Sequence, residues 1–292
     1  MSHSNPPITV ETSYDWSQHV ARLQAKNFYY SFLLLSKEQR RAMCAVYAFM
    51  RYCDDLSDEI SDDPDEDQSP AGRAAAIERW REDLTQALRG ENVPEHFVWP
   101  GFADAVARFK IPHEYFFDMI DGVRSDLGPR HIETFDELYD YCYHVASVVG
   151  LTITHIFGFE SPEALALAEK CGVAFQLTNI LRDVKEDAEK GRVYLPAEDL
   201  RRFGVSPDTF EPRDKFVQLM KFEAARAREY YEQAAPLIDM VHPSSRASLR
   251  ALIGIYSRLL DRIEGANFDV FADRIRVPAW EKMWILVRSL VG

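Results

Sequence analysis

Residues 176–187 read QLTNILRDVKED, a stretch in which polar side chains recur at helical intervals among apolar ones. Asn179, Asp183 and Asp187 are each four residues apart, and Gln176 lies seven residues before Asp183. With about 3.6 residues per turn, all four side chains lie on one face of a helix. Because leucine and isoleucine lie between them, we expect this polar stripe to face a cavity inside a helical bundle.

Helical periodicity runs through most of the chain, whereas the strict alternation of half-buried strands is almost absent. The sequence therefore predicts an all-α protein with a single domain over residues 1–292. Ser36 and Ser161 each precede a predicted helix, as N-cap residues do. The predicted helices cover residues 14–26, 37–57, 71–88, 101–109, 112–127, 135–157, 162–188, 196–203, 213–240, 244–265 and 278–291.

The composition narrows the classes of function. Of 292 residues, 47% are hydrophobic and 12% aromatic, which is ample for a core and an apolar pocket. A formal charge of −13 argues against nucleic acid as a partner, because binding it requires Lys and Arg to neutralise phosphates. Residues 58–70, DEISDDPDEDQSP, are predicted to form an acidic flexible loop. The scattered cysteines favour free thiols in a reducing cytosol.

Neither end of the sequence predicts a secretory signal or a membrane span. Residues 1–16 lack a basic region followed by an apolar one. The apolar segment Trp280–Val291 contains Glu281, Lys282 and Arg288, and it is shorter than the roughly 18 residues that a span needs. We expect a cytoplasmic protein, and peripheral membrane contact stays open.

A second acidic motif lies earlier in the chain. Residues 51–59 read RYCDDLSDE and end a strongly apolar helical stretch. Asp54 and Asp58 are four residues apart, so their carboxylates share a helical face. Like charges at this spacing destabilise an isolated helix, which calls for an explanation such as a bound cation.

Together the two motifs predict a metal-dependent diphosphate site. Mg²⁺ binds oxygen ligands, commonly one or two carboxylates together with substrate phosphates. An allylic diphosphate leaves by ionisation, so its catalyst needs positive charge for the anion and a shielded cavity for the carbocation. Arg51 and Arg182 lie beside the two motifs and are predicted phosphate partners. Solvated acidic helix surface is the ordinary alternative.

Three longer stretches resemble the squalene and phytoene synthase family, whose members join prenyl diphosphates head to head. They are YAFMRYCDDLSDE at 47–59, YCYHVASVVGL at 141–151 and QLTNILRDVKEDAEKGRVYLP at 176–196. The resemblance extends over residues 28–276. It implies the isoprenoid-synthase helical bundle with a central cavity, and condensation of two prenyl diphosphates through a cyclopropyl intermediate.

The resemblance also implies roles for individual residues. Those similar to the family's Mg²⁺ ligands are Asp54 and Asp58 in the first motif and Asn179, Asp183 and Asp187 in the second. The four aspartates, Tyr141 and Tyr256 are implied catalytic residues. Substrate contacts are implied for Arg51, Arg182, Tyr194 and Arg274 at the diphosphates, and for Phe28, Tyr141, Val145, Ala146, Gly150 and Gln176 in the cavity.

Some of these residues also have a purely structural explanation. Tyr141 and Tyr256 fit ordinary burial with a satisfied hydroxyl. Gly150 fits close helix packing, or a place where a missing side chain lets an isoprenoid tail pass. Asn27 stands where many relatives carry serine, which weakens any hydroxyl contact to phosphate there.

The sequence VASVVG at residues 145–150 resembles bacterial hopanoid-pathway presqualene diphosphate synthases more than phytoene synthases. It favours two farnesyl diphosphates as substrates, with presqualene diphosphate, hydroxysqualene or squalene as product. Squalene would require NADPH. The alternatives are a phytoene synthase that uses two geranylgeranyl diphosphates, a terpene cyclase, and a catalytically silent helical assembly factor. Contact with downstream enzymes of the isoprenoid pathway also stays open.

Overall fold

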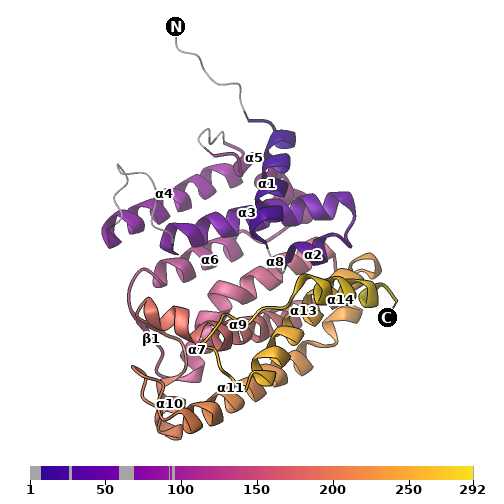
Figure 1. The fold of residues 1–292 in the computed structure, drawn as a ribbon. Coiled ribbons are helices and arrows are strands. Elements are labelled where there is room, and N and C mark those ends of the chain that lie inside the picture. The colour runs from indigo at the N-terminus through magenta and orange to yellow at the C-terminus, as the bar shows by residue number, and fades with distance from the viewer. Residues whose placement is uncertain (1–7, 26–27, 59–68, 92, 94–95, 292) are drawn as a thin grey trace.

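The computed structural model describes residues 8–25, 28–58, 69–91, 93 and 96–291, with Asp58 described for its backbone alone. Regular structure within these residues is almost entirely helical, which confirms the predicted all-α class (Figure 1). The helices are α1 (Val10–Gln24), α2 (Phe28–Phe32), α3 (Lys37–Asp58), α4 (Pro70–Leu88), α5 (Trp99–Phe109), α6 (Glu114–Ser125), α7 (Phe135–Cys142), the π-helix η1 (Tyr143–Ser147), α8 (Val148–Phe157), α9 (Glu163–Glu189), α10 (Ala197–Phe203), α11 (Arg213–Ala234), α12 (Leu237–Met240), the 3₁₀ helix η2 (Pro243–Ser245), α13 (Arg246–Gly265) and α14 (Ala279–Val291).

Local signals place most helix ends close to the predicted positions. The hydroxyl of Ser36 accepts a hydrogen bond from the backbone N–H of Gln39 at 3.3 Å, at the start of α3. The hydroxyl of Ser161 accepts one from the N–H of Glu163 at 3.3 Å, at the start of α9. These side chains satisfy N–H groups that have no partner within the helix.

Four details differ from the prediction. The helix predicted over 135–157 contains the π-helix η1. The helix predicted over 213–240 is interrupted after Ala234, because Pro236 cannot donate a helical hydrogen bond. The short helix α2 was not predicted, nor was a parallel pair formed by β1 (Arg130–His131) and β2 (Arg192–Val193). Strands of two residues are too short for periodicity to reveal. Most of the predicted acidic loop, residues 59–68, lies outside the described residues.

Two large clusters of buried side chains form the core. The first joins α1, α3, α4, α5, α6 and α8, and the second joins α7, α9, α10, α11 and α13. The long helix α9 belongs to both, since Cys171 packs in the first cluster and Ala174 in the second. Phe28 and Phe175 are half-buried and pack against both clusters. The boundary between the clusters is where a cavity forms.

The C-terminal helix α14 packs along α13 and beside α2, on the outside of the bundle (Figure 1). Gly254 of α13 allows this approach, because a Cβ there would lie 2.9 Å from the Cγ2 of Ile285. Across the described part of the chain, the helices are all too short or too polar to cross a bilayer.

Candidate active site

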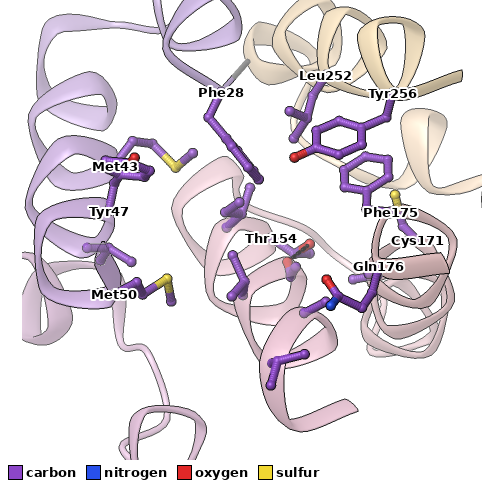
Figure 2. Close-up of a pocket in the computed structure, with 18 of the residues that line it drawn as sticks. Phe28, Met43, Tyr47, Met50, Thr154, Cys171, Phe175, Gln176, Leu252 and Tyr256 are labelled. Atoms are coloured by element: carbon purple, nitrogen blue, oxygen red, sulfur yellow. Dashed lines mark hydrogen bonds between the residues drawn. The ribbon is translucent and has the colours of Figure 1, made fainter. Parts of the chain in front are cut away.

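A cavity of about 400 Å³ opens at the boundary of the two core clusters, between α3, α8, α9 and α13. Figure 2 shows Met43, Tyr47 and Met50 of α3 on one side of it, facing Phe175 and Gln176 of α9. Most of the wall is apolar, and polar side chains are concentrated near the last turn of α3 and the middle of α9. The cavity therefore suits a ligand with a long apolar part and a polar end.

The first acidic motif supplies one side of the polar end. Arg51 and Asp54 line the cavity from the C-terminal part of α3, and the carboxylate of Asp54 is exposed. Arg51 forms an ion pair with Asp55, one helical turn further on. The side chain of Asp58 lies outside the described residues.

The second motif supplies the opposite side. Gln176, Asn179 and Arg182 of α9 line the cavity. The amide Nδ2 of Asn179 donates to Oε1 of Gln176 at 3.4 Å, while Oδ1 of Asn179 is buried and accepts no hydrogen bond from the described residues. A buried oxygen without a donor is costly, so this atom is suited to a cation or a ligand donor.

Two arginines converge on Asp183. The Nε of Arg182 donates to Oδ1 of Asp183 at 2.7 Å, and Nη2 of Arg274 donates to Oδ2 at 3.1 Å. Arg274 also forms an ion pair with Glu186, with 2.9 Å between Nη1 and Oε2. Burial and the nearby charge of Asp183 raise the pKa of Asp187 to about 7. Arg182 and three carboxylates thus lie on one stretch of α9, and Arg274 joins them from the segment between α13 and α14.

Aromatic rings form one wall of the cavity. The rings of Phe175 and Tyr256 stack with their centroids 4.3 Å apart, and the ring of Phe28 meets that of Tyr256 edge-on at 5.7 Å (Figure 2). Tyr47 approaches Phe28 with a centroid distance of 6.5 Å. Aromatic faces are electron-rich, so this wall can stabilise a cation while it excludes water.

Comparison with known proteins identifies the family of this chain. A family model described as squalene/phytoene synthase matches residues 21–281. The chain belongs to the squalene/phytoene synthase family. A 15-cis-phytoene synthase from Synechococcus elongatus is 36% identical to it, over 94% of this chain and 91% of that protein.

Solved structures of the squalene/phytoene synthase family share the fold. A dehydrosqualene synthase crystallised with a ligand has a TM-score of 0.85 and 30% identity, covering 97% of this chain and 96% of its own. A squalene synthase from Alicyclobacillus acidocaldarius has a TM-score of 0.79 and 26% identity, covering 90% of this chain and 97% of its own. The isoprenoid-synthase fold implied by the sequence motifs is confirmed.

The structure brings many of the predicted site residues of this squalene/phytoene synthase family member to one cavity. They come from helices far apart in the sequence, and they combine the polar end with the apolar wall. The predicted residues that line the cavity are Phe28, Arg51, Asp54, Val145, Ala146, Gly150, Gln176, Asn179, Arg182 and Tyr256.

Three predicted substrate contacts are bonded to carboxylates of the protein, and none of them lines the cavity. Tyr141, expected in the cavity, lies outside its lining, and its hydroxyl donates to the carboxylate of Asp126 at 2.9 Å. Tyr194, expected at a diphosphate, donates to the other oxygen of Asp126 at 3.0 Å. Arg274 binds Asp183, as described above. Tertiary packing, which the motifs do not encode, supplies these partners.

Asp126 was not predicted from the sequence. It follows the last residue of α6, and its side chain, 12% exposed, lies between Tyr141 and Tyr194. Arg192 donates to its backbone carbonyl at 2.6 Å, and the guanidinium of Arg130 lies 4.0 Å from its carboxylate. Burial raises its pKa, while the two tyrosine hydrogen bonds oppose that shift. A lone aspartate in a turn has no spacing pattern that could have indicated this position.

The glycine at position 150 makes room for helix packing. A Cβ on Gly150 would lie 2.9 Å from the carbonyl oxygen of Ala168 on α9. A Cβ on Gly172 would lie 2.5 Å from the Cα of Ser147. The two glycines therefore let α9 approach η1 and α8 closely, and of the two earlier explanations for Gly150, the packing one fits this contact.

The oxygen ligands fit a Mg²⁺ ion that is shared with substrate phosphates, rather than one bound by protein ligands alone. Within the described residues, no three Asp, Glu, His or Cys side chains converge on a metal position. Mg²⁺ needs only one or two carboxylates when substrate phosphates complete its shell. Asp54 on α3 and the Oδ1 of Asn179 on α9, which accepts no hydrogen bond from the described residues, offer such ligands from both sides of the cavity. Asp183 lies outside this lining, and its two oxygens accept hydrogen bonds from Arg182 and Arg274.

Proposed function

We propose that this protein condenses two prenyl diphosphates head to head in the cavity between α3 and α9. One observation carries the proposal: an apolar, aromatic-walled cavity whose polar end is flanked by Arg51 and Asp54 on one side and by Asn179 and Arg182 on the other. This distribution matches a substrate with a long hydrocarbon chain and an anionic diphosphate.

Mg²⁺ would be held by Asp54 and Asp58 from α3, and by Asn179, Asp183 and Asp187 from α9. When bound, it supplies positive charge that neutralises the diphosphate as this leaving group departs. Arg51 and Arg182 lie beside these ligands and would donate hydrogen bonds to phosphate oxygens. For Arg182, contact with phosphate means sharing the guanidinium that now binds Asp183.

The cavity wall would serve the hydrocarbon part of the reaction. Loss of diphosphate leaves an allylic carbocation, and the rings of Phe28, Phe175 and Tyr256 would face it. Met43 and Met50 are flexible side chains that can adapt to the shape of a polyisoprenoid. Water is excluded by the same apolar surface, which favours carbon–carbon bond formation over hydrolysis.

The relatives support geranylgeranyl diphosphate as the first substrate to test. The 36% identical relative from Synechococcus elongatus is named a 15-cis-phytoene synthase, and phytoene arises from two C20 units. Farnesyl diphosphate, which the motif at residues 145–150 favours, is the second candidate. It is supported by the dehydrosqualene synthase, which has 30% identity and a TM-score of 0.85. NADPH is left out of the proposal, since neither the cavity nor the relatives support it.

The test is incubation of the purified protein with Mg²⁺ and either geranylgeranyl or farnesyl diphosphate, followed by mass spectrometry of the extracted hydrocarbons. A C40 product supports the phytoene-type reaction, and a C30 product moves the assignment to the squalene type. Parallel reactions with a chelator should give no product. Absence of any Mg²⁺-dependent product from both substrates would contradict the proposal and favour a silent helical assembly factor.

A further inference from the structure

The helix α14 presents its apolar face to solvent. Trp280 and Trp284 are 71% and 58% exposed, and the large apolar residues that share this face are Met283, Val287, Leu290 and Val291. Their spacing of three, four and seven residues forms a single stripe along the helix. A surface helix normally buries such a stripe against the core, so its exposure here indicates a missing partner.

Polar contacts on the opposite face hold the helix in this orientation. Glu281 is buried, and its carboxylate accepts hydrogen bonds from the Nε of Arg258 at 2.6 Å and the Nη1 of Arg262 at 2.8 Å. The ammonium of Lys282 is also buried and lies 5.4 Å from the ring centroid of Tyr30 on α2. Turning the apolar stripe inward would break these charged contacts, which is costly for buried groups.

Arginines lie beside the exposed stripe. The helix α13 has four arginines against two acids, and α14 has one lysine and one arginine against one acid, a net formal charge of +3 in a chain of −13. Arg250, Arg258 and Arg288 line a groove between the two helices together with Trp280 and Trp284. The acids Asp261 and Glu281 line it too and pair with Arg258, so Arg250 and Arg288 give the groove its net positive charge. The guanidinium of Arg288 lies 5.3 Å from the ring centroid of Trp284.

We propose that this face of α14 docks on the surface of a bilayer that contains anionic phospholipid. Tryptophan rings favour the headgroup level of a membrane, and leucine and valine favour the acyl boundary below it. Arginines beside them can bind lipid phosphates, an attraction that the acidic remainder of the chain lacks. The apolar stripe and the basic groove lie on one face, as this mode of binding requires.

A second copy of the chain fits this face less well. A two-fold contact through α14 would bring the basic grooves of both copies together, and like charges would oppose it.

The bilayer also suits the geometry of the cavity. The helix α13 carries the basic groove on one face, while its Leu249, Leu252 and Tyr256 line the cavity on another. Docking would therefore place the cavity one helix away from the lipid.

The first experiment measures co-sedimentation of the full chain with vesicles of phosphatidylcholine alone, or with about 30% phosphatidylglycerol. We expect binding to the anionic vesicles, and weaker binding as NaCl rises from about 0.05 to about 0.5 M. Leu290→Ser should weaken it several-fold, and Trp280→Ser with Trp284→Ser more than about tenfold. The matched control is Leu23→Ser on α1, because Leu23 and Leu290 are each 64% exposed.

The second experiment follows tryptophan fluorescence. Trp280 and Trp284 are exposed, whereas Trp80 and Trp99 are buried and Trp16 is half-buried. A blue shift on vesicle addition that depends on Trp280 and Trp284 therefore reports burial of α14. The double tryptophan variant should lose the shift while keeping turnover of detergent-dispersed substrate, which separates this proposal from the proposed function. Absence of binding to anionic vesicles would overturn the proposal. So would equal binding by the α14 variants, or a dimer in light scattering that these variants dissociate.

Discussion

The phenol rings of Tyr141 and Tyr194 are stacked with their centroids 4.8 Å apart, and both hydroxyls donate to the same carboxylate, that of Asp126. This contact joins the end of α6, the helix α7 and the segment that follows β2. Asp187 lies near enough that the charge of Asp126 helps to raise its pKa. The two tyrosines thus connect the second acidic motif to a carboxylate that comes from another part of the chain.

We predict that Asp126→Ala lowers the free energy of unfolding by about 3 kcal/mol, because two buried hydroxyls lose their acceptor. Turnover should also fall, since the segment carrying Asp187 loses a support. The check is a double-mutant cycle by chemical denaturation, with Tyr141→Phe and Tyr194→Phe as partners. Strong non-additivity is expected for residues of one network. Simple additivity would show that the three side chains act independently.

Asp54→Ala and Asp183→Asn should each reduce Mg²⁺-dependent turnover by a hundredfold or more, on the order expected for loss of a main electrostatic contact to the leaving group. The asparagine keeps an acceptor for the buried guanidinium of Arg182, which protects the fold. The measurement is product formation under saturating substrate, with circular dichroism as the folding check. Asp239→Asn is the control, because that side chain is 79% exposed. Full turnover by either folded site variant would refute the metal assignment.

We predict that Glu223 gives the protein a pH-dependent stability. Burial raises its pKa to about 8, and the neighbouring Asp199 contributes, although Arg226 opposes the shift. The folded state therefore holds a proton that the unfolded state releases near its ordinary pKa of 4.5. Stability from this group is full below pH 4.5 and declines as pH rises towards 8.

Glu223→Gln should flatten that decline, so that the variant gains stability relative to wild type as pH rises from about 5 to about 8. Urea denaturation at several pH values measures it. Glu229→Gln on the same helix is the control, since Glu229 is exposed and should leave the pH dependence unchanged. A parallel decline in wild type and Glu223→Gln would assign the pH dependence to another group.

Gly172→Ala should destabilise the protein by about 1 to 3 kcal/mol and reduce turnover, because the added methyl group forces α9 away from η1. Thermal unfolding and product assays test both effects. Gly265→Ala offers a comparison, as an added Cβ there would meet no atom within 4 Å. Wild-type stability in Gly172→Ala would mean that the helices can separate without cost.

Much of the fold could be predicted because the decisive signals are local. The row from Gln176 to Asp187 needs only the helical period, and Ser36 and Ser161 indicate helix starts within a few residues. Asp126 could not be found this way, because its partners Tyr141 and Tyr194 approach it through tertiary packing. Arg274 was implied by the family resemblance, but its contact with Asp183 joins positions far apart in the sequence, and no local pattern indicates that contact.

The orientation of the C-terminal helix also could not be predicted from local patterns. Periodicity predicted a helix over 278–291, and α14 is there. Which face it turns inward depends on the contacts of Glu281 with Arg258 and Arg262 on α13, which no local pattern contains. The pattern of apolar and polar residues alone favours the opposite orientation, with the apolar face of α14 against the core.

The π-helix at Tyr143–Ser147 has a consequence for how this cavity can change. A π turn accommodates one more residue than an α turn, and each residue of a helix rotates the chain by about 100°. Deleting a single residue here would close the π turn to an α turn, so Val148–Phe157 would keep its orientation and Gly150 its contact with α9. A deletion within Val148–Phe157 has no such extra residue to absorb it, and it would rotate the residues beyond it by about 100°. Along this wall, a change of length is tolerated at the π turn, whereas elsewhere the side chains can vary while the number of residues stays constant.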